Sequence, residues 1–137
     1  IGAVTILPVA EDGTIHLIEQ FRYPVRGSIL EIPAGTLEKG EDREACAARE
    51  LTEETGFRAK TIEQIATFYL APGYSDEVIT LYRATGLERA ETNFDENEII
   101  ELRSVSLDES IEMIKDGRIE DSKTMMALLY ERMLRNG

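Results

Sequence analysis

The sequence contains one cysteine and one histidine among its 137 residues, which excludes several kinds of reactive site. Cys46 alone cannot form an intramolecular disulfide or a cysteine zinc cluster, and because it lies among alanines we predict a small buried residue. A Ser-His-Asp triad would have to use His16, but no G-x-S-x-G sequence accompanies it, so we predict a structural histidine. An EF-hand loop pattern is also missing, which argues against a calcium-binding structural module.

Basic residues are scarce: 15 Lys and Arg stand against 27 Asp and Glu, for a net charge of −12. Because nucleic-acid backbones are bound by clustered Lys and Arg, we expect no nucleic-acid partner. The apolar runs are far shorter than a membrane span and no signal peptide is visible, so we expect no membrane contact and a cytoplasmic location. An anionic protein that acts on anionic phosphates usually needs metal cations between the two.

The length and composition predict one globular domain over residues 1–137. Because the chain opens at Ile1 inside a strand-like pattern, we expect a short N-terminal region to be missing. The order of strands and helices predicts an α/β fold with a mixed sheet covered by helices, and the first two strands should form a hairpin around Asp12-Gly13. Strands are expected at 2–9, 14–22, 29–32, 61–70, 77–85 and 99–105, helices at 42–55, 106–116 and 121–134, and loops at 35–40 and 91–98.

The middle helix carries an acidic face. Positions three and four residues apart are neighbours on a helix, so Glu50, Glu53 and Glu54 lie together within one turn. Like charges at this spacing destabilise a helix unless a cation neutralises them, and Arg49 supplies one. Oxygen-rich sites also suit hard divalent cations. The alternative for three glutamates alone is an ordinary solvated acidic face.

The flanking residues favour the metal site, because together they resemble the Nudix box. The matching residues are Gly35, Glu41, Arg49-Glu50-Leu51, Glu53-Glu54 and Gly56, and Phe57 stands where most members have a bulky aliphatic residue. The resemblance implies an α/β/α sandwich with a mixed central sheet. It also implies a pyrophosphohydrolase that depends on Mg²⁺, with Mn²⁺ as a possible substitute.

The same resemblance implies individual roles within the box. Glu50, Glu54 and the Ala34 carbonyl would bind metal, and Gly35 would let the backbone approach the metal or substrate closely. Glu53 would be a further metal ligand, or would hydrogen-bond to one of the ligands. Arg49 would orient a carboxylate, either Glu41 or Glu53.

Further stretches resemble ADP-ribose pyrophosphatases. They are residues 19–24, residues 30–35 and residues 71–77, and Pro72 falls at the fifteenth position after Phe57, where that subfamily has a marker proline. The resemblance implies hydrolysis of ADP-ribose to AMP and ribose 5-phosphate. It leaves open another nucleoside diphosphate sugar, such as GDP-mannose or ADP-glucose, and a Nudix-shaped domain that senses its ligand without cutting it.

Carried over to this chain, the subfamily pattern assigns further residues. Arg22 would bind substrate phosphate, although a structural ion pair is the alternative. Glu31 and Glu77 would hydrogen-bond ribose or phosphate-bound water, or pair with Arg22. Glu96 would be the general base and Glu98 an additional metal ligand, unless the acidic loop is merely solvated.

The resemblance also implies a homodimer. Residues of the last helix could supply an apolar dimer surface, although helix stripes more often face the core. These residues are Met125, Met126, Leu128, Leu129 and Met133.

Overall fold

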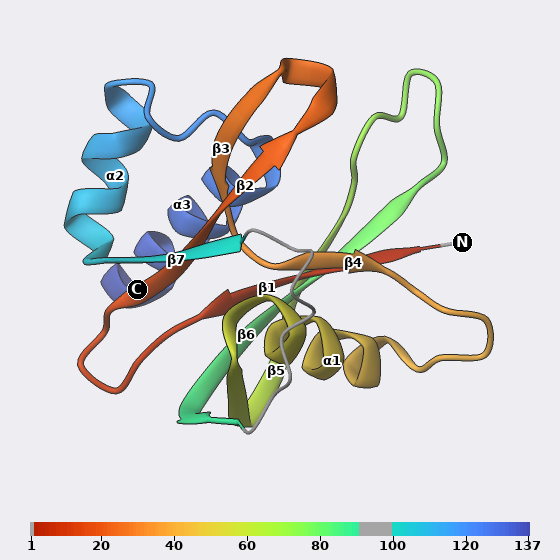
Figure 1. The fold of residues 1–137 in the computed structure, drawn as a ribbon, viewed down its shortest axis with the longest axis horizontal. Helices are drawn as coiled ribbons and strands as arrows, with labels where there is room; N and C mark the ends of the chain where they lie inside the picture. Colours follow the sequence, from red (N-terminus) through yellow and green to blue (C-terminus); the bar gives the residue numbers. More distant parts are fainter. Residues whose placement is uncertain (1, 91–99) are drawn as a thin grey trace.

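The computed structural model describes residues 2–90 and 100–137, and Figure 1 shows their arrangement. Its helices are close to those expected from the sequence. The strands are β1 (Ala3–Pro8), β2 (Ile15–Arg22), β3 (Gly27–Glu31), β4 (Ala34–Thr36), β5 (Phe57–Tyr69), β6 (Val78–Arg89) and β7 (Ile100–Val105). The helices are α1 (Arg43–Thr55), α2 (Leu107–Lys115) and α3 (Ser122–Asn136), with the short 3-10 helix η1 at Tyr23–Val25. No described helix is long and apolar enough to cross a membrane.

The strands form two sheets, in the orders β4-β1-β6-β5 and β3-β2-β7. The first sheet is mixed, because β1 runs parallel to β6 and antiparallel to β4. The expected hairpin of β1 with β2 is wrong: the two strands belong to different sheets and meet only at a bridge between Val9 and Ile15. Strand β1 is buried almost throughout, because both faces of its sheet are covered, and it pairs with β4 and β6 rather than with β2.

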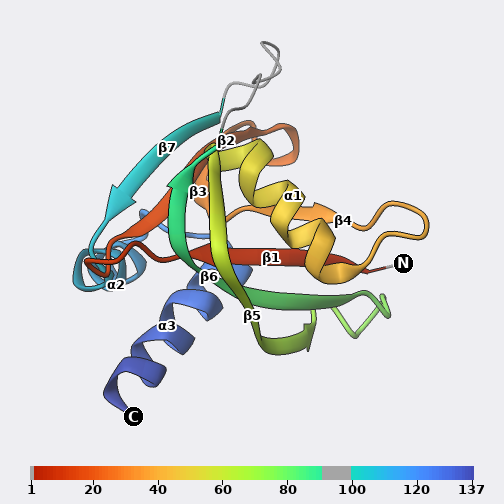
Figure 2. The ribbon, with the colours of Figure 1, turned by 90° about the horizontal axis from the view of Figure 1, so that it is seen from below.

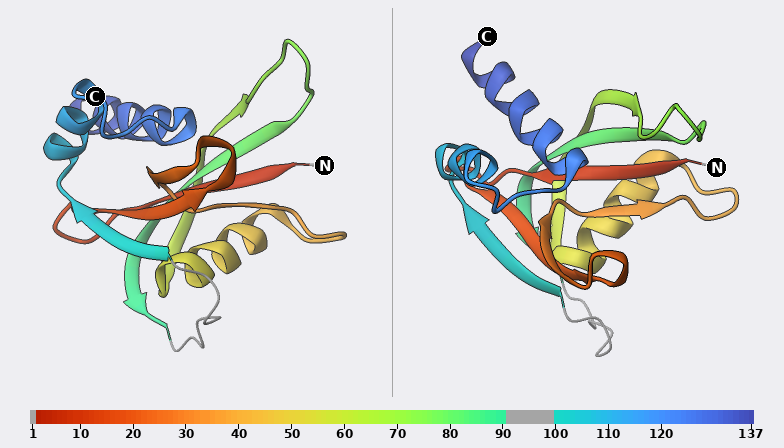
Figure 3. Two further views of the ribbon diagram at one scale, coloured as in Figure 1. Left: turned by 45° about the horizontal axis from the view of Figure 1, so that its top comes forward. Right: turned by 90° about the horizontal axis from the view of Figure 1, so that it is seen from above.

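Helices cover both faces of the mixed sheet, which confirms the expected fold class (Figure 2). Strand β1 shows this directly. Val4 and Ile6 pack in the core cluster under α1, whereas Leu7 and Val9 pack in the cluster that α2 and α3 cover. Figure 3 shows α2 and α3 lying together on their side of the molecule.

Three strands, β4, β5 and β6, differ most from the expected ranges. β4 lies at the start of the expected 35–40 loop, where it pairs with β1. The sequence does not indicate this strand, because it has only three residues and one of them is a glycine. β5 begins at Phe57 rather than at residue 61, and β6 continues to Arg89 rather than ending at residue 85. β5 is largely exposed and has a register shift between Gln64 and Ala66, so its sequence lacks regular alternation.

The ends of α1 lie where the sequence indicates them. The Asp42 carboxylate accepts a hydrogen bond from the Ala45 N–H and caps the helix. Gly56 ends it with a φ of 78°, and its N–H donates to the Thr52 carbonyl. These caps fix the helical register, and with it the face that carries Glu50 and Glu54.

Glu131 of α3 is a buried carboxylate away from the acidic face of α1. It is 1% exposed and accepts hydrogen bonds from Arg83 Nε at 2.7 Å and Arg135 Nε at 2.9 Å. Burial alone would raise the pKa of Glu131, but the hydrogen bonds from the two arginines outweigh it and hold the pKa below the usual 4.5. The ionised Glu131 therefore stabilises the folded state above pH 4.5, and this contribution is lost as the pH falls through its lowered pKa.

We expect Glu131→Gln to lower the free energy of unfolding by about 3 kcal/mol at pH 7, because it leaves two guanidinium groups without a buried counter-charge. Urea unfolding at a series of pH values measures this. The difference from wild type should shrink as the pH falls below 4.5. Glu112→Gln, which removes an exposed ion pair with Lys115, should change the free energy by less than about 1 kcal/mol. A pH-independent difference would contradict the ionised pairing of Glu131.

Candidate active site

Arg49 organises the carboxylates at one side of α1. Its Nε and Nη2 donate to the two oxygens of Glu41 at 2.8 and 2.9 Å, and its Nη1 donates to Glu50 at 3.0 Å and to Glu53 at 3.3 Å. The hydrogen bond from Arg49 lowers the pKa of Glu41 to about 2, and Glu41 in turn raises the pKa of Arg49. Arg49 therefore orients both carboxylates that the sequence offered as its partner, together with Glu50.

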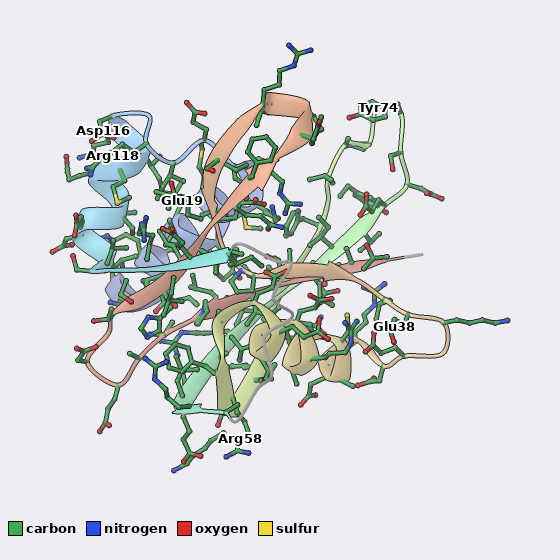
Figure 4. All side chains as sticks on the ribbon, viewed as in Figure 1. Glu19, Glu38, Arg58, Tyr74, Asp116 and Arg118 are labelled. Atoms are coloured by element: carbon green, nitrogen blue, oxygen red, sulfur yellow. The ribbon has the colours of Figure 1, made fainter. Side chains whose placement is uncertain are left out.

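Figure 4 shows Glu38 on the loop between β4 and α1. Its carboxylate lies 3.8 Å from Arg49 Nη1 and is 71% exposed. An exposed carboxylate at this distance adds little to the orientation of the arginine. Glu41 is the stronger partner, since it is largely buried and binds through both oxygens.

Gly35 leaves space for Glu50. A Cβ built on Gly35 would lie closer than 3.0 Å to Cγ, Cδ and Oε1 of Glu50, a separation that real Cβ atoms essentially never show. The Glu50 side chain is only 13% exposed. Burial raises the pKa of Glu50, and Arg49 partly offsets this. The glycine is therefore required by contact with a carboxylate of α1, and no left-handed backbone is involved.

Glu54 lies one turn further along α1. Its Oε2 accepts a hydrogen bond from the Ala34 N–H at 3.3 Å. Burial, followed by the charge of Glu50, raises the pKa of Glu54 to about 8. A carboxylate in this environment is stabilised in its charged form when a cation binds beside it. Glu53, in contrast, is 55% exposed.

The carbonyl of Ala34 belongs to an edge strand and faces away from β1. Ile6 N–H donates to the Pro33 carbonyl, and Leu37 N–H donates to the Gly2 carbonyl. In an antiparallel pair hydrogen-bonded positions alternate, so Ala34, paired with Thr5, turns its N–H and C=O to the other side. Since its N–H reaches Glu54, its carbonyl is directed to the same side.

Arg22 pairs with Glu31, as one of the sequence alternatives predicted. Arg22 Nε donates to Glu31 Oε2 at 2.7 Å and its Nη2 donates to Oε1 at 3.1 Å. This hydrogen bonding raises the pKa of Arg22, and the charge of Glu54 adds to the effect, so the pair lies near the acidic face of α1. Arg22 remains 42% exposed, whereas Glu31 is 2% exposed.

Lys123 is the residue that sequence reasoning missed. Its Nζ donates to Glu31 Oε1 at 2.6 Å and to Asp121 at 2.9 Å. The sequence around it indicates only a helix start, capped by Asp121. No local pattern links Lys123 to a carboxylate 92 positions away along the chain.

Three other predicted residues stay untested by the geometry. Glu77 is half-buried before β6, and its described hydrogen bonds are made by its backbone: its N–H donates to the Ser75 hydroxyl and its carbonyl accepts from the Leu70 N–H. Glu96 and Glu98 lie outside the described residues. A cavity of about 530 Å³ lies elsewhere, between the turn after β1, the middle of β6 and the end of α3, and no predicted site residue lines it.

The donors on α1 and β4 fit a hard divalent cation. Glu50, Glu54 and the Ala34 carbonyl supply oxygen, which Mg²⁺ prefers, and Gly35 keeps a side chain from filling the space against Glu50. Among residues 2–90 and 100–137, no three His, Cys, Asp or Glu side chains form a metal site by themselves.

Comparisons with known proteins agree with this arrangement. The NUDIX domain model matches residues 1–128. The chain is 45% identical to a methanol dehydrogenase activator of Bacillus methanolicus and 41% identical to an ADP-ribose pyrophosphatase of Bacillus subtilis (strain 168), in each case over 94% of this chain and 71% of the relative. It is 36% identical to a GDP-mannose pyrophosphatase of Yersinia enterocolitica, over 96% of this chain and 73% of the relative.

A solved structure shows the same fold. The crystal structure of an ADP compounds hydrolase superposes with a TM-score of 0.89 and 25% sequence identity. The match covers 99% of this chain and 73% of the other.

Proposed function

This chain belongs to the NUDIX domain family and is a hydrolase, and on that premise we propose that it hydrolyses the pyrophosphate bond of ADP-ribose to AMP and ribose 5-phosphate. The observation that carries the proposal is that the Glu50 carboxylate packs against Gly35, while Glu54 accepts a hydrogen bond from the adjacent Ala34 N–H. It gathers the oxygen donors of the box at one place. The 41% identity to an ADP-ribose pyrophosphatase supports this choice of substrate.

Enzymes of this family generally need a divalent cation, and we propose Mg²⁺, with Mn²⁺ as a substitute. Glu50, Glu54 and the Ala34 carbonyl would hold it. When bound, the cation polarises the phosphate and lowers the pKa of a bound water. Glu98, which lies outside the described residues, is proposed as an additional ligand.

The chain's own groups have distinct tasks in this proposal. Arg49 holds Glu50 and Glu53 in orientation. Arg22 is 42% exposed and near enough to Glu54 to feel its charge, and it binds a phosphate oxygen of the substrate. Glu77 contacts the ribose. Glu96 takes the proton from the attacking water, because carboxylates that bind metal are poor bases.

Turnover of three nucleoside diphosphate sugars tests the substrate. With Mg²⁺, we expect kcat/KM for ADP-ribose to exceed that for GDP-mannose by about tenfold or more, because a site that hydrogen-bonds one base leaves polar groups unpaired with another. ADP-glucose shares the base and should fall between them. A higher kcat/KM for GDP-mannose would move the chain to the function of its 36% identical Yersinia relative.

A second candidate comes from the relative named as a methanol dehydrogenase activator, which shares 45% identity. This chain could likewise act on a dehydrogenase. Adding it to a methanol dehydrogenase assay, with and without Mg²⁺, tests that activity directly. An increased dehydrogenase rate without turnover of any nucleoside diphosphate sugar would favour this role over the proposed hydrolysis.

We also propose a cytoplasmic homodimer. Met125, Met126 and Leu128 pack into the core, so the core interpretation of the last helix holds for them. Leu129 and Met133 are 50% and 58% exposed on α3 and offer apolar surface to a second copy. Tyr74, 90% exposed at the turn between β5 and β6, is a separate apolar position on the surface (Figure 4).

A further inference from the structure

The first turn of α3 is tied to Arg22 of β2 through ion pairs that share the buried carboxylate of Glu31. Glu31, at the end of β3, is 2% exposed and accepts three hydrogen bonds. Two come from Arg22 and one comes from Lys123, which is itself 13% exposed. Glu31 therefore joins a partly exposed cation at the proposed substrate site to a buried cation on α3.

Lys123 is fixed from the other side by the cap of α3. The Asp121 carboxylate accepts from Lys123 Nζ at 2.9 Å, from the Thr124 N–H at 3.2 Å and from the Thr124 hydroxyl at 2.6 Å. The Thr124 hydroxyl in turn accepts from the Ile32 N–H at 3.0 Å, next to Glu31. Because the Lys123 ammonium group is bound to both Glu31 and Asp121, its side chain has little conformational freedom and holds Glu31 in one place.

The charges show what this connection does. Glu31 contacts two cations, Arg22 and Lys123, and Lys123 also pairs with Asp121, so the four side chains together carry no net charge, and without Lys123 they would carry one net negative charge. Without Lys123, Glu31 would neutralise Arg22 alone. A guanidinium neutralised in this way attracts a phosphate less strongly, and Glu31 would also be free to shift.

We propose that Lys123 is a positioning residue for the substrate site: by sharing Glu31 with Arg22, it holds the guanidinium where it binds a substrate phosphate. This inference rests on the proposed hydrolysis of a nucleoside diphosphate sugar. Lys123 does not itself touch the reacting atoms. It acts through Glu31, and its removal should weaken substrate binding more than the chemical step.

Another buried carboxylate among the described residues, Glu131, provides a matched control. Like Glu31, it contacts two cations, Arg83 and Arg135, and Arg135 lies on α3 as Lys123 does. None of these three residues belongs to the proposed site. Arg135→Met removes one of two cations from a buried glutamate, as Lys123→Met does, but without a link to Arg22.

We expect Lys123→Met to raise KM for ADP-ribose about tenfold while kcat stays within about threefold of wild type, since partners that orient a binding residue typically account for factors of 10 to 100. Lys123→Arg, which keeps the cation, should recover most of the loss. Arg135→Met should lower the melting temperature and leave KM unchanged. Calorimetry of the metal-free protein with ADP-ribose in EDTA should show the same loss of affinity for Lys123→Met alone.

Lys123→Gln, which keeps a donor for Glu31 without the charge, serves if the methionine variant does not fold. If these variants lower the melting temperature but leave both KM and the affinity for ADP-ribose at the wild-type value, Lys123 is only structural and the inference is wrong. Failure of the proposed function looks different, because the wild-type protein would then hydrolyse none of the three nucleoside diphosphate sugars.

Discussion

Glu54→Gln should lower kcat/KM for ADP-ribose by at least about 10²-fold, because a metal that polarises a phosphate contributes several kcal/mol and each 1.4 kcal/mol is tenfold in rate. Glutamine keeps the size of the side chain and an acceptor for the Ala34 N–H. It removes one negative charge from the proposed metal site, and the remaining donors, Glu50 and the Ala34 carbonyl, should bind the cation more weakly. Calorimetry with Mg²⁺ should show weaker binding than in wild type.

Stability separates this result from unfolding. Because burial raises the pKa of Glu54 to about 8, ionising it costs folding free energy, and that cost grows between pH 4.5 and 8. The metal-free glutamine variant should therefore be at least as stable as wild type near pH 8, and Mg²⁺ should stabilise it less. Glu44→Gln, at an exposed position of the same helix, should change neither Mg²⁺ affinity nor turnover. Unchanged metal affinity in Glu54→Gln would remove Glu54 from the ligand set.

Gly35→Ala should lower kcat/KM by about 10²-fold, because displacing a positioned group by about 1 Å can cost this much. The new methyl group would overlap Glu50, so either β4 or the carboxylate must move. Overpacking of this kind costs about 1–3 kcal/mol of folding free energy. Steady-state kinetics, Mg²⁺ calorimetry and thermal unfolding together measure the two effects.

Gly27→Ala is the matched control. Gly27 is also a strand glycine, and a Cβ there would have its nearest neighbour at 3.9 Å, an ordinary contact. It should leave Mg²⁺ affinity within about twofold of wild type, as expected for a site away from strain. If Gly35→Ala keeps wild-type turnover and metal affinity, the position of Glu50 seen here is not required for the reaction.

Local features were predictable from the sequence because they depend on residues close together in the chain. The caps Asp42 and Gly56 set the register of α1, and the helical repeat then places Glu50 and Glu54 on one face. Cys46 is buried, as expected for a small residue between alanines. The resemblance to the Nudix box rests on the same short stretch, and the family match confirms it.

Other features depend on pairing between distant segments. Two strand-like stretches at 2–9 and 14–22, joined by a turn, suit a hairpin as well as two strands of different sheets, so only their pairing with distant strands decides between them. The His16 ring stacks on Phe57 with 4.7 Å between ring centroids, and its Nδ1 is hydrogen-bonded to the Ser104 hydroxyl. Neither contact could be predicted from the place of His16 in a strand.

The sequence by itself determined the chemistry of the candidate site: which carboxylates share a helical face, and that a glycine stands before them. Only the tertiary structure decided why that glycine is needed, since Gly35 and Glu50 meet across β4 and α1. It also decided that Glu31 joins Arg22 to Lys123. Both contacts join elements that lie apart in the chain. Helix periodicity acts over four residues, whereas such contacts arise only when the sheet and helices pack around a common core.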